Sequence, residues 1–594
     1  MLKLFTLFTK KEWLLIVVAI AFTVLGVWIE LEIPGYLREI TNIVTMPETG
    51  SMDDIWRLGG MMLLLSFGSM AVIMIVAWIG AVVSSGHSLN IRNKIYKKIN
   101  DFSTAEMNEF SVPSLITRTT NDVTAVNMFS LLAIMLLFRS PILAVWAIRR
   151  IVYVSPELST VTAVTVGLMI VVVLFITILV VPRFIRIQKL TDKLNQDARE
   201  NLSGIRVVHA YNAQEFEQDK FEKTNRALAR DNLLVNRVMM IFMPFITLLF
   251  TGLTIGLYWV GSWLLSSGQV DNPPGFLGDL MAFVQYSSMI VGSFMMLTML
   301  FVYLPSAIVS GRRINEILSK KNTIKDPKKG SNDNGNRDIC FKGVNFGYPD
   351  AEENVLTDIS LEIPHGKTVA FIGGTGSGKT SIIKVLTRLF DVKSGEVTIG
   401  NRCIKNIKQD ELNSIIGYVP QTATVFSGTV KSNIAFGKVL KRNGEGELIS
   451  HDVTDEEVVE ALKTAEAWEF VKKLEGGIES EIAQAGKNLS GGQKQRLSIA
   501  RTVVRKPDIF IFDDTFSALD YATDRKVRKN LKDRTAGSTV IIVAQRIGTI
   551  KEADIIYVVD KGTIAASGTH AELMKTSEIY KEIALSQLSK EELA

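Results

Sequence analysis

The stretch Gly373-Gly374-Thr375-Gly376-Ser377-Gly378-Lys379-Thr380 decides the fold of the second half of the chain. It fits the phosphate-binding loop pattern G-x-x-x-x-G-K-[ST]. Residues 368–372 before it read as a short buried strand, and the apolar spacing of 381–388 after it predicts a helix. Such a loop directs backbone N–H groups at phosphate oxygens, while its lysine reaches the β- and γ-phosphates and its hydroxyl binds Mg²⁺. The predicted nucleotide-binding residues are Gly373, Gly376, Ser377, Gly378, Lys379 and Thr380.

Composition points to a membrane part followed by a soluble part. The chain has 594 residues, of which 47% are hydrophobic, and its mean hydropathy is +0.22. These values are high for a soluble protein, and the apolar residues crowd into the first half. The net charge is only +5, and no long basic run with interleaved aromatic residues is present, which argues against a nucleic-acid partner. The two cysteines, Cys340 and Cys403, argue against a disulfide framework and fit a reducing cytoplasm.

Six apolar runs in the first half predict transmembrane helices, because a hydrocarbon core needs about 20 apolar residues. Lys and Arg residues cluster after the second and fourth runs, and basic residues are retained on the cytoplasmic side. We therefore expect a multi-pass protein of the cell (inner, or cytoplasmic) membrane, with both termini and the soluble part in the cytoplasm. The predicted spans are 13–29, 58–86, 128–154, 158–182, and one span each within 238–270 and 280–311.

The two internal connections, 87–125 and 183–237, are far longer than turns and continue a helical pattern away from the membrane. We interpret residues 108–113 and 210–216 at their tips as short coupling helices that dock on the soluble part. The alternative is that each tip is a solvated loop. The proposed coupling residues are Phe110, Tyr211 and Glu215.

Two features suggest a binding cavity among the spans. Arg139 lies within an apolar run, where an ionisable residue is a functional hypothesis by default. It faces either a water-filled cavity or a partner on a neighbouring helix or chain. Span six is rich in methionine, including Met295 and Met299, which suits an adaptable apolar binding wall but also fits ordinary helix packing or contact with lipid.

A charged, aperiodic stretch after span six reads as a linker. The expected organisation is a transmembrane domain at 1–318, a linker at 319–337 and a nucleotide-binding domain at 338–594.

Asp513 and Tyr348 are two further candidate residues of the predicted nucleotide site. Asp513 closes the hydrophobic run 509–513, an arrangement that holds Mg²⁺ beside a nucleotide. The aromatic ring of Tyr348 suits stacking on an adenine, and the alternative is a buried tyrosine of a strand.

Three further positions complete the set. Residues 489–493, Leu-Ser-Gly-Gly-Gln, open a predicted helix whose N-terminus forms a second anion site, with Ser490, Gly492 and Gln493 as candidates. Gln421 and Gln545 each follow an apolar, strand-like run.

The order of these motifs resembles that of the ATP-binding cassette (ABC) transporters, in particular exporters of the half-transporter type. The most specific element is 489–493, which looks like the signature motif of the family. Residues 201–208, Asn-Leu-Ser-Gly-Ile-Arg-Val-Val, are similar to the exporter segment that leads into the second coupling helix. The implied fold class is an α-helical membrane domain of six transmembrane helices fused to a cytosolic α/β P-loop ATP-binding cassette domain.

The resemblance also implies roles and partners. It implies a dimer that sandwiches two ATP molecules, each between the P-loop of one chain and the signature of the other. It implies an A-loop role for Tyr348, a Q-loop role for Gln421 and a D-loop role for 517–520. ATP and Mg²⁺ are the implied cofactors, with Thr380, Gln421 and Asp513 around the metal.

This chain departs from the family pattern at the reacting end of the site. Asp514 stands where the family has a glutamate that acts on the attacking water, and its side chain is one methylene shorter. Gln545 stands where the family has a histidine, and a glutamine cannot become cationic. Gln484 replaces a glutamate usual before the signature, with no effect assigned.

These departures predict that the chain binds ATP well, hydrolyses it poorly, and uses Ser490, Gly492 and Gln493 to complete the catalytic site of a partner. The expected partner is a homologous half-transporter that retains the glutamate and the histidine. The combination resembles heterodimeric bacterial multidrug exporters, which implies small hydrophobic substrates taken from the lipid bilayer. The alternatives are a lipid or peptide exporter, and an ATP-gated regulatory or channel-like protein. DNA-repair and chromosome ATPases share the signature, but six spans argue against this class.

Overall fold

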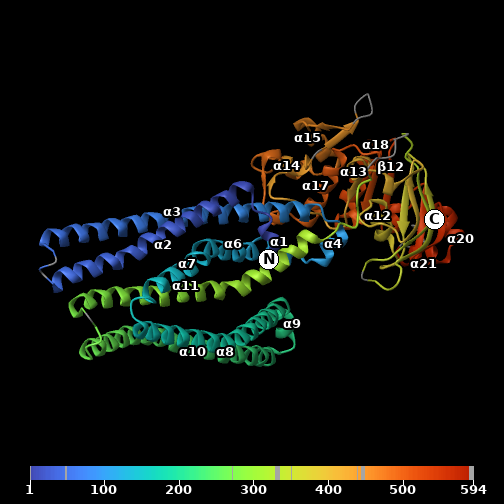
Figure 1. Cartoon of the computed structure of the whole chain (residues 1–594). Coiled ribbons are helices and arrows are strands. Elements are labelled where there is room, and N and C mark those ends of the chain that lie inside the picture. The colour runs from blue at the N-terminus through green and yellow to red at the C-terminus, as the bar shows by residue number, and fades with distance from the viewer. Residues whose placement is uncertain are drawn as a thin grey trace. The chain divides into compact units, whose positions relative to one another are not determined.

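The computed structural model describes residues 2–46, 48, 50–270, 272–327, 335–349, 351–437, 439–442 and 448–587 (Figure 1). The chain divides into two compact units. The membrane unit comprises Met1–Asn100 and Pro113–Lys320, and the nucleotide unit comprises Asp101–Val112 and Lys321–Ala594. Positions 328–334 of the predicted linker lie outside the described residues.

Long helices build the membrane unit (Figure 1). Among the described residues, six helical segments are long and apolar enough to cross a membrane, which confirms the predicted number. The third is assembled from several pieces and begins before the predicted residue 128. The prediction followed apolar residues alone, whereas the helical segment also contains polar residues before 128. Asp122, for example, accepts a hydrogen bond from Ser310 at 2.8 Å. The helices are α1 (Leu2–Phe5), α2 (Lys10–Thr45), α3 (Met52–Asn100), α5 (Val112–Thr119), α6 (Asn121–Leu132), the π-helix η2 (Ala133–Leu137), α7 (Arg139–Ile151), α8 (Pro156–Ser203), α9 (Ile205–Ala210), α10 (Gln214–Ser266) and α11 (Pro273–Ser319).

One apolar core joins α2, α7, α8, α10 and α11. Two hydrogen bonds pair polar groups inside it, where a bilayer core would supply no water. The Tyr286 hydroxyl donates to the carbonyl of Leu31 at 3.0 Å, and the hydroxyls of Thr162 and Ser287 lie 2.9 Å apart. These bonds fix α11 against α2 and α8.

The helices α8 and α10 stay paired beyond their apolar stretches (Figure 1). The buried carboxylate of Asp231 accepts a hydrogen bond from Arg183 at 3.0 Å and forms an ion pair with Arg186 at 3.0 Å. Nearer the tip, Thr224 donates to Asp197 at 3.1 Å. Polar contacts therefore hold this pair together where hydrophobic burial ends.

The short helix at the first tip begins earlier than predicted. Helix α4 spans Thr104–Glu109 instead of 108–113, because Ser103 and Glu106 form a capping box that starts the helix at residue 104. Phe110 is the residue that ends this helix; it is buried, and its ring stacks on Phe102 with centroids 5.9 Å apart. Helix α4 lies in the stretch that packs with the nucleotide unit.

The second tip is also displaced from its predicted position, 210–216. The short helix is α9, and Tyr211 ends it with its side chain exposed. Asn212 adopts a left-handed conformation with φ of 51°, which breaks the helix, and Glu215 already lies in the first turn of α10.

Two sheets form the nucleotide unit. The larger has the order β14-β13-β3-β12-β11-β6, in which the five strands from β13 to β6 are parallel and β14 is antiparallel. The smaller is antiparallel, in the order β2-β1-β4-β5. Their strands are β1 (Ile339–Phe346), β2 (Leu356–Ile363), β3 (Thr368–Ile372), β4 (Ser394–Ile399), β5 (Arg402–Cys403), β6 (Ile416–Val419), β11 (Ile509–Asp513), β12 (Thr539–Val543), β13 (Ile555–Asp560) and β14 (Thr563–Gly568).

The larger sheet separates two hydrophobic cores, because successive side chains of a strand point to opposite faces. In β11, Phe510 and Phe512 enter one core while Ile509 and Ile511 enter the other. Strands buried on both faces read as unbroken apolar runs, which is why β3 and β11 match the predicted strands.

Helices and short pairings complete the unit. The helices are α12 (Lys379–Leu386), α13 (Gln409–Ile415), α14 (Val430–Ile434), α15 (Asp455–Thr464), α16 (Trp468–Val471), α17 (Gly491–Val503), α18 (Tyr521–Arg534), α19 (Ile547–Ile550), α20 (His570–Thr576) and α21 (Glu578–Gln587). Single turns of 3₁₀-helix are η3 (Ile404–Asn406), η4 (Gly477–Glu479), η5 (Gln484–Gly486) and η6 (Thr515–Ala518). The pairings are β7 (Gly428–Thr429) with β10 (Glu481–Ile482), and β8 (Val439–Arg442) with β9 (Leu448–His451).

Candidate functional site

The loop after the central strand β3 has the backbone shape that its glycines predict. Gly376 and Gly378 adopt left-handed φ values of 80° and 106°, which side-chain-bearing residues rarely accept. A Cβ at Gly373 would lie 2.1 Å from the carbonyl oxygen of Val559, so only glycine fits there. The loop runs directly into the N-terminus of α12, where the helix dipole favours an anion.

Lys379 places its positive charge inside this loop. Its Nζ donates to the carbonyls of Gly373 at 2.9 Å and Gly374 at 2.7 Å, and the side chain is almost fully buried. Burial lowers the pKa of Lys379, an effect that the nearby carboxylates of Asp514 and Asp513 oppose. Nζ also donates to the Ser377 hydroxyl at 3.4 Å, and a buried cation held by such neutral groups is well placed to exchange them for phosphate oxygens.

Asp513 lies next to the hydroxyl of the loop. Thr380 Oγ1 donates to Asp513 Oδ1 at 3.1 Å, and the Tyr418 hydroxyl donates to Asp513 Oδ2 at 3.2 Å. Burial raises the pKa of Asp513, and its two hydrogen bonds lower it only in part. A buried carboxylate beside a hydroxyl fits Mg²⁺, which favours one or two carboxylates plus substrate phosphates.

Among the described residues, no group of three or more His, Cys, Asp or Glu is arranged to hold a metal. Mg²⁺ at this site would therefore take Thr380 and Asp513 from the protein and its remaining oxygen ligands from nucleotide and water. Gln421, the third predicted metal ligand, donates to Asp514 in this structure.

Asp514 brings together the two predicted glutamines. Gln421 Nε2 donates to Asp514 Oδ2 at 3.1 Å, and Gln545 Nε2 donates to the same oxygen at 3.3 Å. Asp514 itself has a left-handed backbone with φ of 45°, set by the turn that follows β11. Its carboxylate is thus engaged by two neutral amides.

Tyr348 lies at the edge of the smaller core. Its ring packs edge-on against Phe346 and Phe390, and its hydroxyl lies 3.1 Å from Ser381 Oγ on α12. Lys384 donates to the same hydroxyl at 3.3 Å. The side chain is half-buried, and its role in binding adenine stays a prediction.

The signature residues form the start of α17. Ser490 caps the helix by accepting from the backbone N–H of Gln493 at 3.3 Å, and Gln493 Oε1 accepts from the backbone N–H of Ser490 at 2.8 Å. Gly492 lies in the first turn, where a Cβ would stand 3.4 Å from the carbonyl oxygen of Ala518. Gln484 lies nearby in sequence and is exposed at the start of a 3₁₀ turn.

Tyr418 is the contact that sequence reasoning missed. It lies in the strand β6, three residues before Gln421, in the run Ile-Gly-Tyr-Val. A hydroxyl in an otherwise apolar buried strand was the available signal, since a buried phenol needs a hydrogen-bond partner.

Comparison with known proteins agrees with this geometry. Residues 16–294 match the ABC transporter transmembrane region, and residues 356–517 match the ABC transporter family. An ABC transporter ATP-binding protein of Mycobacterium bovis is 35% identical over 91% of this chain and 90% of its own length. The ABC transporter ATP-binding protein YfiB of Bacillus subtilis is 31% identical over 98% of both chains. This chain belongs to the ABC transporter family.

The ABC transporter also shares its fold with a solved structure, that of a bacterial Atm1-family ABC exporter with ATP bound. The TM-score is 0.77 at 22% identity, over 97% of this chain and 98% of that one. The six helices and the α/β domain are therefore those of an ABC transporter: a multi-pass membrane region fused to an ATP-binding domain.

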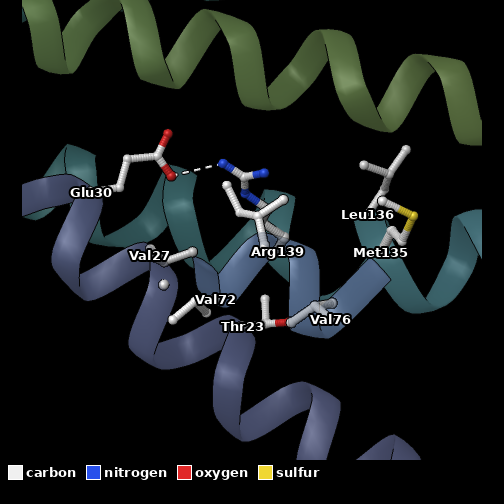
Figure 2. Close-up of a pocket in the computed structure, with 10 residues that line it drawn as sticks. Thr23, Val27, Glu30, Val72, Val76, Met135, Leu136 and Arg139 are labelled. Carbon is white, nitrogen blue, oxygen red and sulfur yellow. Dashed lines mark hydrogen bonds and ion pairs between the residues drawn. The ribbon is translucent and has the colours of Figure 1, made fainter. Parts of the chain in front are cut away.

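Inside the membrane unit of the transporter, Arg139 donates to Glu30 Oε2 at 2.8 Å (Figure 2). The two side chains are 18% and 24% exposed and line a small cavity of about 40 Å³ between α2, α3, η2 and α7. Sequence reasoning named Arg139 but missed Glu30, which lies just beyond the predicted first span. Met295 and Met299 are exposed on α11 and do not line this cavity. A substrate role for these three predicted residues stays a prediction.

Lys379→Ala removes the charge held in the P-loop and is expected to weaken ATP binding at least about tenfold, the cost of losing charge-assisted hydrogen bonds. A fluorescent ATP analogue titrated into the full-length protein in nanodiscs measures the affinity. Lys367→Ala is the matched control, because Lys367 lies just before β3 and pairs with Asp554 on the surface. Equal affinities in the two variants would refute the assignment.

Arg139→Gln leaves Glu30 without its partner, so it is expected to lower the thermal unfolding temperature. The double variant Glu30→Gln/Arg139→Gln should lose less than the sum of the single variants, with a coupling of about 1–3 kcal/mol. Thermal unfolding in detergent measures the cycle. The more exposed pair of Arg150 and Glu32 serves as the control and should couple more weakly. Additive effects at Arg139 and Glu30 would contradict the prediction.

Proposed function

We propose that this transporter is one half of a heterodimeric, ATP-driven exporter of hydrophobic or amphipathic compounds, of the multidrug efflux kind. The observation that carries the proposal is the arrangement at Asp514. Its Oδ2 atom accepts hydrogen bonds from Gln421 and Gln545, at the position where ATP hydrolysis needs a group acting on water. The exporter fold of the solved relative supports the direction of transport.

The chemistry around Asp514 favours binding over hydrolysis. The carboxylate is one methylene shorter than a glutamate and is already engaged by two amides. A displacement of about 1 Å at a reacting group costs roughly 100-fold in rate. A glutamine at 545 donates a hydrogen bond without adding positive charge, so it stabilises transition-state charge less than a protonated histidine.

The signature helix supports the second half of the proposal. Ser490 and Gln493 form a complete capping box, and α17 runs for 13 residues from an exposed start. Such a helix N-terminus is ready to receive the phosphates of a nucleotide bound to another chain. The proposed partner is a homologous half-transporter that supplies the missing glutamate and histidine, so its site turns over while this one holds ATP.

The membrane setting supports a cytoplasmic ATP site. Lys97 and Lys98 lie in the last turn of α3, and Arg183 and Arg186 lie on α8 beyond its apolar stretch. Because basic residues are retained on the cytoplasmic side, they support the proposal that these ends, both termini and the nucleotide unit lie inside the cell. The exposed Met295 and Met299, together with the Arg139–Glu30 pair, are the proposed contacts for amphipathic substrates.

The second candidate is an ATP-gated regulatory or channel-like protein, which a slowly hydrolysing site would also suit. Vectorial accumulation separates the two, because a passive gate cannot move a dye against its gradient. A lipid or peptide exporter would share the mechanism and differ only in the compound that stimulates ATP turnover.

The double variant Asp514→Glu/Gln545→His restores the family residues and is expected to raise the ATPase rate of this chain, purified alone, by about 100-fold. The steady-state rate in nanodiscs is the measurement. Adding Lys379→Ala to the double variant should abolish the gain. Brisk hydrolysis by the unaltered chain alone, lost in Asp514→Asn, would overturn the proposal of a degenerate site.

In inverted vesicles containing the assembled transporter, ATP should drive a hydrophobic dye into the lumen. Replacing the catalytic glutamate of the partner with glutamine is expected to stop accumulation, whereas Asp514→Asn in this chain should reduce it far less. Equal losses would mean that the two sites hydrolyse alike, and dye entry that stops at equilibrium would favour the gate.

A further inference from the structure

Residues 321–326, here called the strap, follow α11 and are bonded at both ends to elements of the nucleotide unit. The strap belongs to that unit, and so do residues 101–112, which follow α3. Two membrane helices, α3 and α11, therefore continue directly into segments that are hydrogen-bonded to each other.

The first end of the strap is bonded to α4. Thr323 donates its backbone N–H to Glu106 Oε1 at 2.9 Å, and its hydroxyl lies 3.0 Å from Ser103 Oγ. Asn322 Nδ2 donates to the carbonyl of Asp101 at 2.6 Å, one residue after the end of α3. Each bond joins residues more than 200 positions apart in sequence.

Glu106 is the centre of this junction, with only 1% of its surface exposed. Its second oxygen, Oε2, accepts from the backbone N–H of Ser103 at 2.8 Å and from the Ser103 hydroxyl at 2.5 Å. Burial raises the pKa of Glu106, but the hydrogen bonds from Ser103 and Thr323 outweigh it and lower the pKa overall. The group is thus an ionised acceptor used at both oxygens.

The second end of the strap is bonded to the P-loop helix α12. Arg388 follows this helix, is 3% exposed, and donates from Nη2 to the carbonyl of Lys325 at 3.0 Å. Its Nη1 donates to the carbonyl of Ile407 at 3.2 Å. Asp326 accepts from the backbone N–H of Gln409 at 2.9 Å, at the start of α13.

The two ends define a short bonded route. Helix α12 has eight residues, about 12 Å, between Lys379 at the phosphate site and its last turn before Arg388. Beyond Arg388 the route passes through Lys325 and Thr323 to Glu106. Ala105 of α4 also packs on the core that contains the apolar face of α12, so α4 and the P-loop helix share one packed body.

We propose that Glu106 and Arg388 are positioning residues that couple the nucleotide state of the P-loop to the ends of α3 and α11 through the strap. Their consequence for transport rests on the proposed function, but the coupling of ATP to α4 does not. A merely structural role would alter stability without altering the response of α4 to ATP.

The test uses the full-length protein in nanodiscs and amide hydrogen exchange of residues 104–109, with and without Mg²⁺ and ATP. In the unaltered protein ATP should slow exchange in α4. Glu106→Gln leaves a single oxygen acceptor in place of two, and Arg388→Lys removes the guanidinium group that reaches two carbonyls. Each variant should reduce this ATP-dependent change by about tenfold. ATP affinity, measured by titration of a fluorescent analogue, should change less than about twofold.

Arg402→Ala is the matched control, because Arg402 is similarly buried in the same unit and its ion pair, with Glu411 at 2.8 Å, joins α13 instead of a residue of the strap. It should keep the wild-type response of α4. No response in the unaltered protein, or the wild-type response in both test variants, would overturn the proposal, as would an equal loss in Arg402→Ala. Dye transport by the unaltered transporter is measured separately, so its failure would contradict the proposed function and leave the exchange result to decide on the strap.

Discussion

The parallel order of the strands β13, β3, β12, β11 and β6 is the constraint on which the site depends. Parallel strands end at the same edge of a sheet, so residues that follow different strands meet there. This edge gathers Gly373 after β3, Gln421 after β6, Asp513 at the end of β11 and Gln545 after β12. Two hydrophobic cores hold the strands from both faces, which makes the edge a rigid support for groups placed about 3 Å apart.

Lys379 and Asp513 are buried charged groups at this edge, and a nucleotide with its metal would supply the opposite charges. Burial makes ionisation of Asp513 costly, and the same burial makes the cationic form of Lys379 costly. A phosphate chain beside Lys379 would stabilise its cationic form, and a divalent cation beside Asp513 would stabilise the ionised carboxylate. Asp514 differs, because its half-buried carboxylate is already satisfied by neutral amides. The candidate binding groups, Lys379 and Asp513, are thus distinct from the neighbouring carboxylate of Asp514.

The sequence was sufficient where a local pattern carries the information. The runs 368–372 and 509–513 are buried on both faces and end at the functional residues, so their bounds match β3 and β11. The tips were misplaced because a capping box at Ser103 and a left-handed Asn212 override helical periodicity. Contacts such as Glu106 with Thr323 and Arg139 with Glu30 join distant positions, and no local pattern encodes them.

The π-helical turn at 133–137 has a consequence for how this membrane helix tolerates changes in length. A π turn contains one residue more than an α turn, and each residue of an α-helix advances the chain by about 100°. The π turn takes up one residue more than an α turn for about the same rotation, so loss of any one residue from 133–137 would let the segment regularise while Arg139 keeps facing Glu30. A single-residue deletion within α7, which has no such turn to absorb it, would rotate the residues after it by about 100°, so a deletion within 133–137 is expected to be tolerated better.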